Sequence, residues 1–149
     1  MIGINRRHLL AGSAGALAVA AFGVAPAHAA NNAQDLIKAF TGGKQAVEAK
    51  VKLDLPEIAE NGNTVPMTVT VESPMTEASH VTEVLVLADG NPNAGVATFH
   101  FTPASGVAEA NTRIRLAATQ NIIAVAKMND GSFVTASKQV KVTIGGCGG

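Results

Sequence analysis

The clearest structural signal in this chain lies in residues 122–144, which read IIAVAKMNDGSFVTASKQVKVTI. In the second half, Val140, Val142 and Ile144 fall on one face, and this period of two is typical of a strand with one buried side. The first half is a short apolar run. Asp130-Gly131 between the halves favours a tight hairpin turn. Residues 122–144 therefore predict two strands joined by a hairpin.

Alternation with a period of two recurs upstream. Apolar residues from Val47 to Leu55 alternate with charged ones, and residues 65–71 repeat the pattern. Pro66 has no N–H to donate and predicts an edge position for that strand. Shorter apolar runs, separated by recognised turn residues, follow at 81–88, 96–101 and 108–116.

Seven short strands without intervening helices predict one all-β domain, an immunoglobulin-like antiparallel β-sandwich. A small barrel is the alternative. One short helix is expected before the first strand, because Leu36, Ile37 and Phe40 have helical spacing. Asn32 is the expected N-cap, and Gly42-Gly43 is the expected stop.

The N-terminal residues have the order of an export signal. Arg6 and Arg7 precede a Gly- and Ala-rich apolar run, and Ala27-His28-Ala29 follows it as a small-x-small cleavage site. The paired arginines favour a twin-arginine signal, with an ordinary secretory signal as the alternative. The run is too short and too rich in glycine to predict stable membrane insertion. We therefore expect cleavage after Ala29 and a periplasmic mature protein.

Three segments follow from these patterns: a signal peptide at 1–29, a sandwich domain at 30–144 and a C-terminal arm at 145–149. The chain has 11 basic and 11 acidic residues, with Arg6 and Arg7 in the signal. The mature part is thus slightly acidic, which argues against nucleic acid as a partner. His80 and His100 lack metal-ligand spacing, so no metal or cofactor is expected.

The tail is Gly145-Gly146-Cys147-Gly148-Gly149, and Cys147 is the only cysteine in the chain. Glycine explores more backbone space than any other residue, so the four glycines predict a mobile arm. An extended chain would carry Cys147 about 10 Å beyond Ile144. A lone cysteine in an exported protein has no internal partner and is usually either reactive or intermolecular. An incidental cysteine in a frayed terminus is the alternative.

The tail also resembles a known family. Residues 140–149, VKVTIGGCGG, are similar to the end of SoxY, the sulfur-carrier subunit of the bacterial sulfur-oxidising system. Residues 58–66 (IAENGNTVP), 99–103 (FHFTP), 112–116 (TRIRL) and 129–133 (NDGSF) resemble that family too. The resemblance implies covalent attachment of thiosulfate-derived sulfur at Cys147, in a carrier that is not itself an enzyme.

The resemblance further implies several partners. A separate haem enzyme would couple thiosulfate to Cys147, a hydrolase would release sulfate, and a sulfane dehydrogenase would oxidise the remaining sulfur. A SoxZ-type subunit would complete a heterodimer. Three rival functions remain open from the residues: a module that uses Cys147 only for an intermolecular disulfide, a ubiquitin-like carrier loaded on its terminal Gly-Gly, and a peroxidase built on Cys147.

Overall fold

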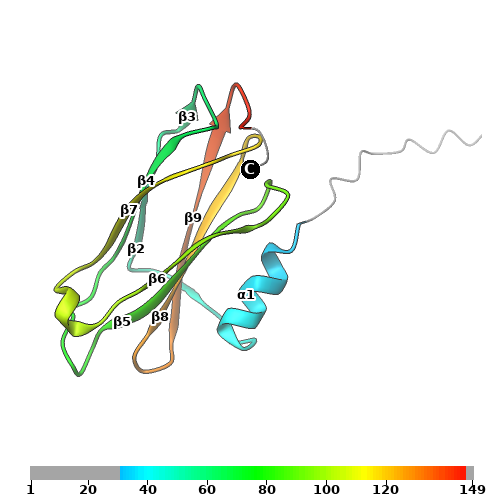
Figure 1. Cartoon of the computed structure of the whole chain (residues 1–149). Helices are drawn as coiled ribbons and strands as arrows, with labels where there is room; N and C mark the ends of the chain where they lie inside the picture. Colours follow the sequence, from blue (N-terminus) through cyan, green and yellow to red (C-terminus); the bar gives the residue numbers. More distant parts are fainter. Residues whose placement is uncertain (1–30, 147–149) are drawn as a thin grey trace, which may run out of the picture.

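The computed structural model describes residues 31–146, which form a two-sheet sandwich with one short α-helix (Figure 1). Arg6, Arg7, Ala27 and Ala29 of the predicted signal lie outside the described residues. The elements in chain order are α1 (Ala33–Thr41), β1 (Val47–Glu48), β2 (Val51–Asp54), β3 (Ile58–Ala59), β4 (Val65–Val71), β5 (Val81–Ala88), β6 (Gly95–His100), the 3-10 helix η2 (Pro103–Ser105), β7 (Ala108–Ile114), β8 (Gln120–Met128) and β9 (Phe133–Val142).

The larger sheet has the order β1-β9-β8-β5-β6, and β3 also pairs with β9. The smaller sheet has the order β2-β4-β7. The main core lies between the two sheets and contains Val84, Val86 and Ile122 from the larger one and Met67 and Val69 from the smaller one. The predicted all-β sandwich is confirmed. Its pairing is not wholly antiparallel, because β1 and β3 both run parallel to β9.

The stretch from Val47 to Leu55 is not one strand, as its alternation predicted, but two strands in different sheets. Val47 pairs with Val134 of β9, whereas Leu53 pairs with Val69 of β4. The backbone turns at Lys50, where φ is 62°. A left-handed residue cannot continue a strand, so the chain leaves the larger sheet there and enters the smaller one. Alternation of side chains does not reveal such a crossing.

The predicted edge position of the strand that contains Pro66 is wrong. β4 is the central strand of its sheet and pairs with β7 along its whole length. On the other side, its pairing with β2 ends where Asp54 faces Thr68. Pro66 lies beyond that point, so the β2 side of β4 is open there and needs no N–H donor.

The predicted helix is confirmed as α1, and it ends at Gly42 in the left-handed conformation with φ of 63°. Asn32 is the N-cap residue, but its side chain makes no cap hydrogen bond. Its Oδ1 instead accepts a bond from the N–H of Ala94 at 3.3 Å. Leu36 and Ile37 pack with Leu87 and other apolar residues of the larger sheet, forming a second small core outside the sandwich.

The β8–β9 hairpin turns through Asn129, Asp130 and Gly131, with Gly131 at φ of 84°. The N–H of Met128 donates to the carbonyl of Ser132 at 2.9 Å, which closes the turn. Ser132 also donates its N–H and its hydroxyl to Oδ1 of Asp130, at 2.8 and 2.6 Å. The hydroxyl bond is the main reason that the pKa of Asp130 lies below its ordinary value of 3.8.

We expect Ser132→Ala to raise the pKa of Asp130 towards 3.8. A lowered pKa means that the ionised form favours the folded state; this contribution is present above the unfolded-state pKa and is lost as the pH falls through the folded-state pKa. The titration is followed by NMR of the Asp130 side-chain carbon. Ser137→Ala, at an exposed position of β9, is the matched control and should leave the pKa unchanged. An unaltered pKa in Ser132→Ala would contradict the assignment.

Candidate functional site at the root of the C-terminal tail

Of the residues predicted to form the arm, the structure describes Gly145 and Gly146. The attachment residue Cys147 and the two last glycines, Gly148 and Gly149, lie outside the described residues. β9 carries the chain to Val142, and Thr143 continues the bonding to the end of β3. Its N–H donates to the carbonyl of Ala59 at 3.1 Å, and its hydroxyl donates to the carbonyl of Glu60 at 3.0 Å. The tail therefore leaves the larger sheet from a held position.

Three backbone hydrogen bonds join the tail to two loops that are distant in sequence. The N–H of Gly62 donates to the carbonyl of Ile144, the N–H of Leu116 donates to the carbonyl of Gly62, and the N–H of Gly146 donates to the carbonyl of Leu116, each at 2.8 Å. We call this arrangement the tail clamp and define it as the bonded residues Gly62, Leu116, Ile144 and Gly146, together with Gly145 and Ala117, whose backbones pack closely beside them. It joins the loops that precede β4 and β8 to the chain just after β9.

The clamp requires glycine at three positions because its backbones approach closely. A Cβ at Gly62 would stand 2.2 Å from the carbonyl oxygen of Leu116, and one at Gly145 would stand 2.1 Å from that of Ala117. A Cβ at Gly146 would stand 2.8 Å from the carbonyl oxygen of Gly62. Contacts below about 3.0 Å force a shift of the backbone. None of the three has a left-handed φ, so close approach is what demands glycine there.

The role of Gly145 and Gly146 as flexible parts of the arm stays a prediction, and the structure shows where these two residues lie. Gly146 is buried, and both residues pack against other backbone segments. The absence of a Cβ allows a glycine either to move freely or to fit where no other residue fits. The sequence pattern is the same in both cases. In the structure, Gly145 and Gly146 lie where a side chain would not fit. The reach of about 10 Å from Ile144 to Cys147 also stays a prediction, because Cys147 lies outside the described residues.

Asn91 holds the loop that contributes Leu116 and Ala117, and sequence reasoning missed it. Its side chain is 3% exposed. Its Nδ2 donates to the carbonyl of Arg115 at 2.8 Å, and its Oδ1 accepts from the N–H of Ala117 at 2.9 Å. The same Oδ1 accepts from Nε2 of Gln120 at 2.8 Å. Asn91 thus bonds to the residues on both sides of Leu116.

Gln120 completes this buried polar network. It is 4% exposed, donates Nε2 to the carbonyl of Ala118 at 2.9 Å, and accepts the N–H of Gly90 on Oε1 at 2.8 Å. Asn91 lies in a segment, 89–92, that its residue types mark only as a turn. A buried asparagine within a turn motif has no sequence signature that separates it from an exposed one.

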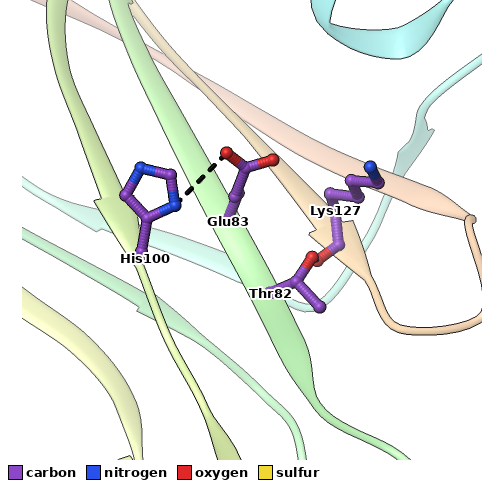
Figure 2. Close-up of polar contacts among 4 residues, drawn as sticks. All are labelled: Thr82, Glu83, His100 and Lys127. Atoms are coloured by element: carbon purple, nitrogen blue, oxygen red, sulfur yellow. Dashed lines mark hydrogen bonds and ion pairs between the residues drawn. The ribbon is translucent and has the colours of Figure 1, made fainter.

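Neither His80, which bonds to Asn129 of the β8–β9 hairpin, nor His100 takes part in the hydrogen bonds of the tail clamp. His100 on β6 faces Glu83 on β5, with Nδ1 3.3 Å from a carboxylate oxygen (Figure 2). The His100 side chain is 70% exposed, so it lies on the sheet surface. Within residues 31–146 no three or more His, Cys, Asp or Glu side chains gather as a metal site. In the same range no helix has the length and apolarity to span a membrane.

A family model described as sulfur oxidation protein SoxY matches residues 37–147, most of the chain. The chain belongs to the SoxY family. The structure of the sulfur carrier protein SoxY from Chlorobium limicola f thiosulfatophilum matches with a TM-score of 0.61 and 32% sequence identity. The match covers 74% of this chain and 96% of that one. Membership of the SoxY family makes this chain a sulfur carrier of sulfur oxidation.

Other solved structures share the fold alone. A superoxide reductase (neelaredoxin) from Ignicoccus hospitalis matches with a TM-score of 0.56 at 18% identity, covering 63% of this chain and 80% of its own. A putative superoxide reductase from Thermotoga maritima matches with a TM-score of 0.53 at 21% identity, covering 69% and 89%. At these identities the likeness extends to the sandwich and not to the chemistry. Among curated protein sequences none matches the chain.

Proposed function

We propose that the thiol of Cys147 covalently holds thiosulfate-derived sulfur while separate enzymes act on it. The observation that carries this proposal is the family match, which ends at Cys147 and so includes the only cysteine of the chain. The tail clamp adds support because it fixes the chain immediately before that residue. SoxY membership thus gives the sulfur-carrier role, and the covalent site is our inference.

The proposed chemistry begins with an oxidative coupling. The Cys147 thiol and the outer sulfur of thiosulfate form an S–S bond, the thiol loses its proton, and two electrons pass to a separate haem enzyme. Water then cleaves the bond between the outer sulfur and the sulfonate group, which releases sulfate and leaves a persulfide on Cys147. A sulfane dehydrogenase would oxidise that persulfide sulfur.

The chemical groups of the clamp bear on which protein activates the Cys147 thiol. The hydrogen bonds of the clamp join backbone N–H and carbonyl groups to one another, and such groups supply no general base for a thiol. A cysteine needs a depressed pKa or a neighbouring base to be a strong nucleophile. We therefore propose that the enzymes that receive the tail activate Cys147. The carrier would act in the periplasm, after export through the signal at 1–29, as a heterodimer with a SoxZ-type subunit.

Intact mass of protein purified from thiosulfate-grown cells tests the covalent site. We expect a species heavier by a thiosulfate or sulfane-sulfur adduct, which a reductant returns to the bare thiol and which maps to the peptide that contains Cys147. A population that consists only of disulfide-linked dimers would instead support the rival interaction module. An adduct on the terminal carboxylate would support the ubiquitin-like mode, and both results would overturn the proposal.

A further inference from the structure

Gly62 lies far from Cys147 in sequence but takes part in two of the three hydrogen bonds that hold the tail. Its N–H donates to the carbonyl of Ile144, and its carbonyl accepts from Leu116, which in turn accepts from Gly146. Both backbone polar groups of this one buried residue are therefore used within the clamp. A substitution at Gly62 can open the clamp without any change to the Gly-Gly-Cys-Gly-Gly sequence.

The clamp is more constrained than a simple tether needs to be. A tether gains reach from free glycines, whereas here Gly145 and Gly146 are packed against other backbone segments, and ordering a backbone residue costs conformational entropy. The carbonyl that receives the N–H of Gly146 is itself positioned by the buried Asn91 side chain, which bonds to Arg115 and Ala117 on either side of it. Buried side-chain bonds of this kind are expected where the position of a backbone group, here the carbonyl of Leu116, is important for function.

We propose that Gly62 is a positioning residue for the sulfur-bearing thiol, an inference that rests on the function proposed above. By holding Ile144 and Leu116, it makes Gly146 the point from which the thiol is presented to each enzyme. Gly146, the last described residue before Cys147, is held through its N–H by the carbonyl of Leu116. An enzyme then has fewer residues to order when the tail enters its active site.

Two variants open the clamp at two different residues, and a third serves as control. In Gly62→Ala the new Cβ meets the carbonyl of Leu116, and in Gly145→Ala it meets the carbonyl of Ala117. Gly145 is exposed and lies outside every strand, so its variant keeps the test valid if Gly62→Ala folds poorly. Gly95→Ala in β6 is the matched control, because a Cβ there makes only an ordinary contact, 3.7 Å from Leu36.

The mature protein is purified with any stably bound subunit, and three quantities are compared. We expect both clamp variants to lose hydrogen-exchange protection at the Gly146 amide. We expect kcat/KM of the thiosulfate-coupling enzyme for the carrier to fall about tenfold, since each freed residue must be ordered again. Alkylation of Cys147 by iodoacetamide should stay within about twofold of the parent rate, because a small reagent needs no positioned tail. Gly95→Ala should match the parent protein in all three.

A kcat/KM of the coupling enzyme that is unchanged or higher in both clamp variants would overturn the inference. Equal decreases in kcat/KM and in the rate of alkylation would also overturn it, because they would mean a general loss of access to the thiol. A Gly146 amide without protection in the parent protein would overturn it as well. The absence of any sulfur adduct in the parent protein is a separate result: it counts against the proposed function, while exchange at Gly146 still tests the clamp.

Discussion

Cys147→Ser is expected to abolish thiosulfate-dependent oxygen uptake while leaving the fold intact. A serine hydroxyl cannot form the S–S bond on which the proposed carrier cycle depends, so uptake should fall to the level of cells that lack the protein. The core should be unaffected, because within residues 31–146 no side chain after Val142 belongs to a hydrophobic core cluster. Uptake is measured with an oxygen electrode, and thermal unfolding of the purified variant checks the fold.

A displaced thiol provides the sharpest control. The double variant Cys147→Ser with Ser137→Cys keeps one cysteine but moves it to an exposed position on β9. We expect this protein to be alkylated normally at the new site and still to support no uptake, since the thiol no longer follows the clamped Gly146. Normal uptake in either variant would refute a carrier function based on Cys147.

Asn91→Ala is expected to cause a large loss of stability. It removes the partners of the Arg115 carbonyl, the Ala117 N–H and one Gln120 N–H at once. Each buried polar group left without a partner costs about 1–3 kcal/mol. Since Nε2 of Gln120 keeps its bond to Ala118, we expect the free energy of unfolding to fall by about 3 kcal/mol. Urea denaturation measures this change.

Asn93→Ala is the matched control for that experiment. Asn93 lies two residues further along the same loop and is exposed. Its replacement should change the free energy of unfolding by no more than about 0.5 kcal/mol. Equal effects of the two substitutions would show that the buried network adds nothing beyond an ordinary turn asparagine. The Asn91 variant should also lose hydrogen-exchange protection at Gly146, because the loop that bonds to this residue is released.

Much of the strand pattern could be predicted from single elements. The runs at 81–88 and 65–71 coincide with β5 and β4, and the short helix appears at its expected place as α1. In these segments the local periodicity and the tertiary burial agree. The run at 47–55 shows the limit, since one positive φ at Lys50 sends its two halves to different sheets. The parallel pair between β3 and β9 also had no sequence signal, because Ile58–Ala59 is too short to show a period.

The amino-acid sequence alone determined the class of fold, because alternating apolar residues can be buried in only one way on a pleated strand. The sequence also shows that Cys147 is the single cysteine, and the family resemblance implies that this cysteine carries the sulfur. The tertiary structure decided what the tail glycines do. Gly145 and Gly146 pack against backbone from residues 62 and 116–117, and such close approach depends on loops brought together only by folding. The root of the predicted arm is therefore a held segment, which local sequence could not distinguish from a free one.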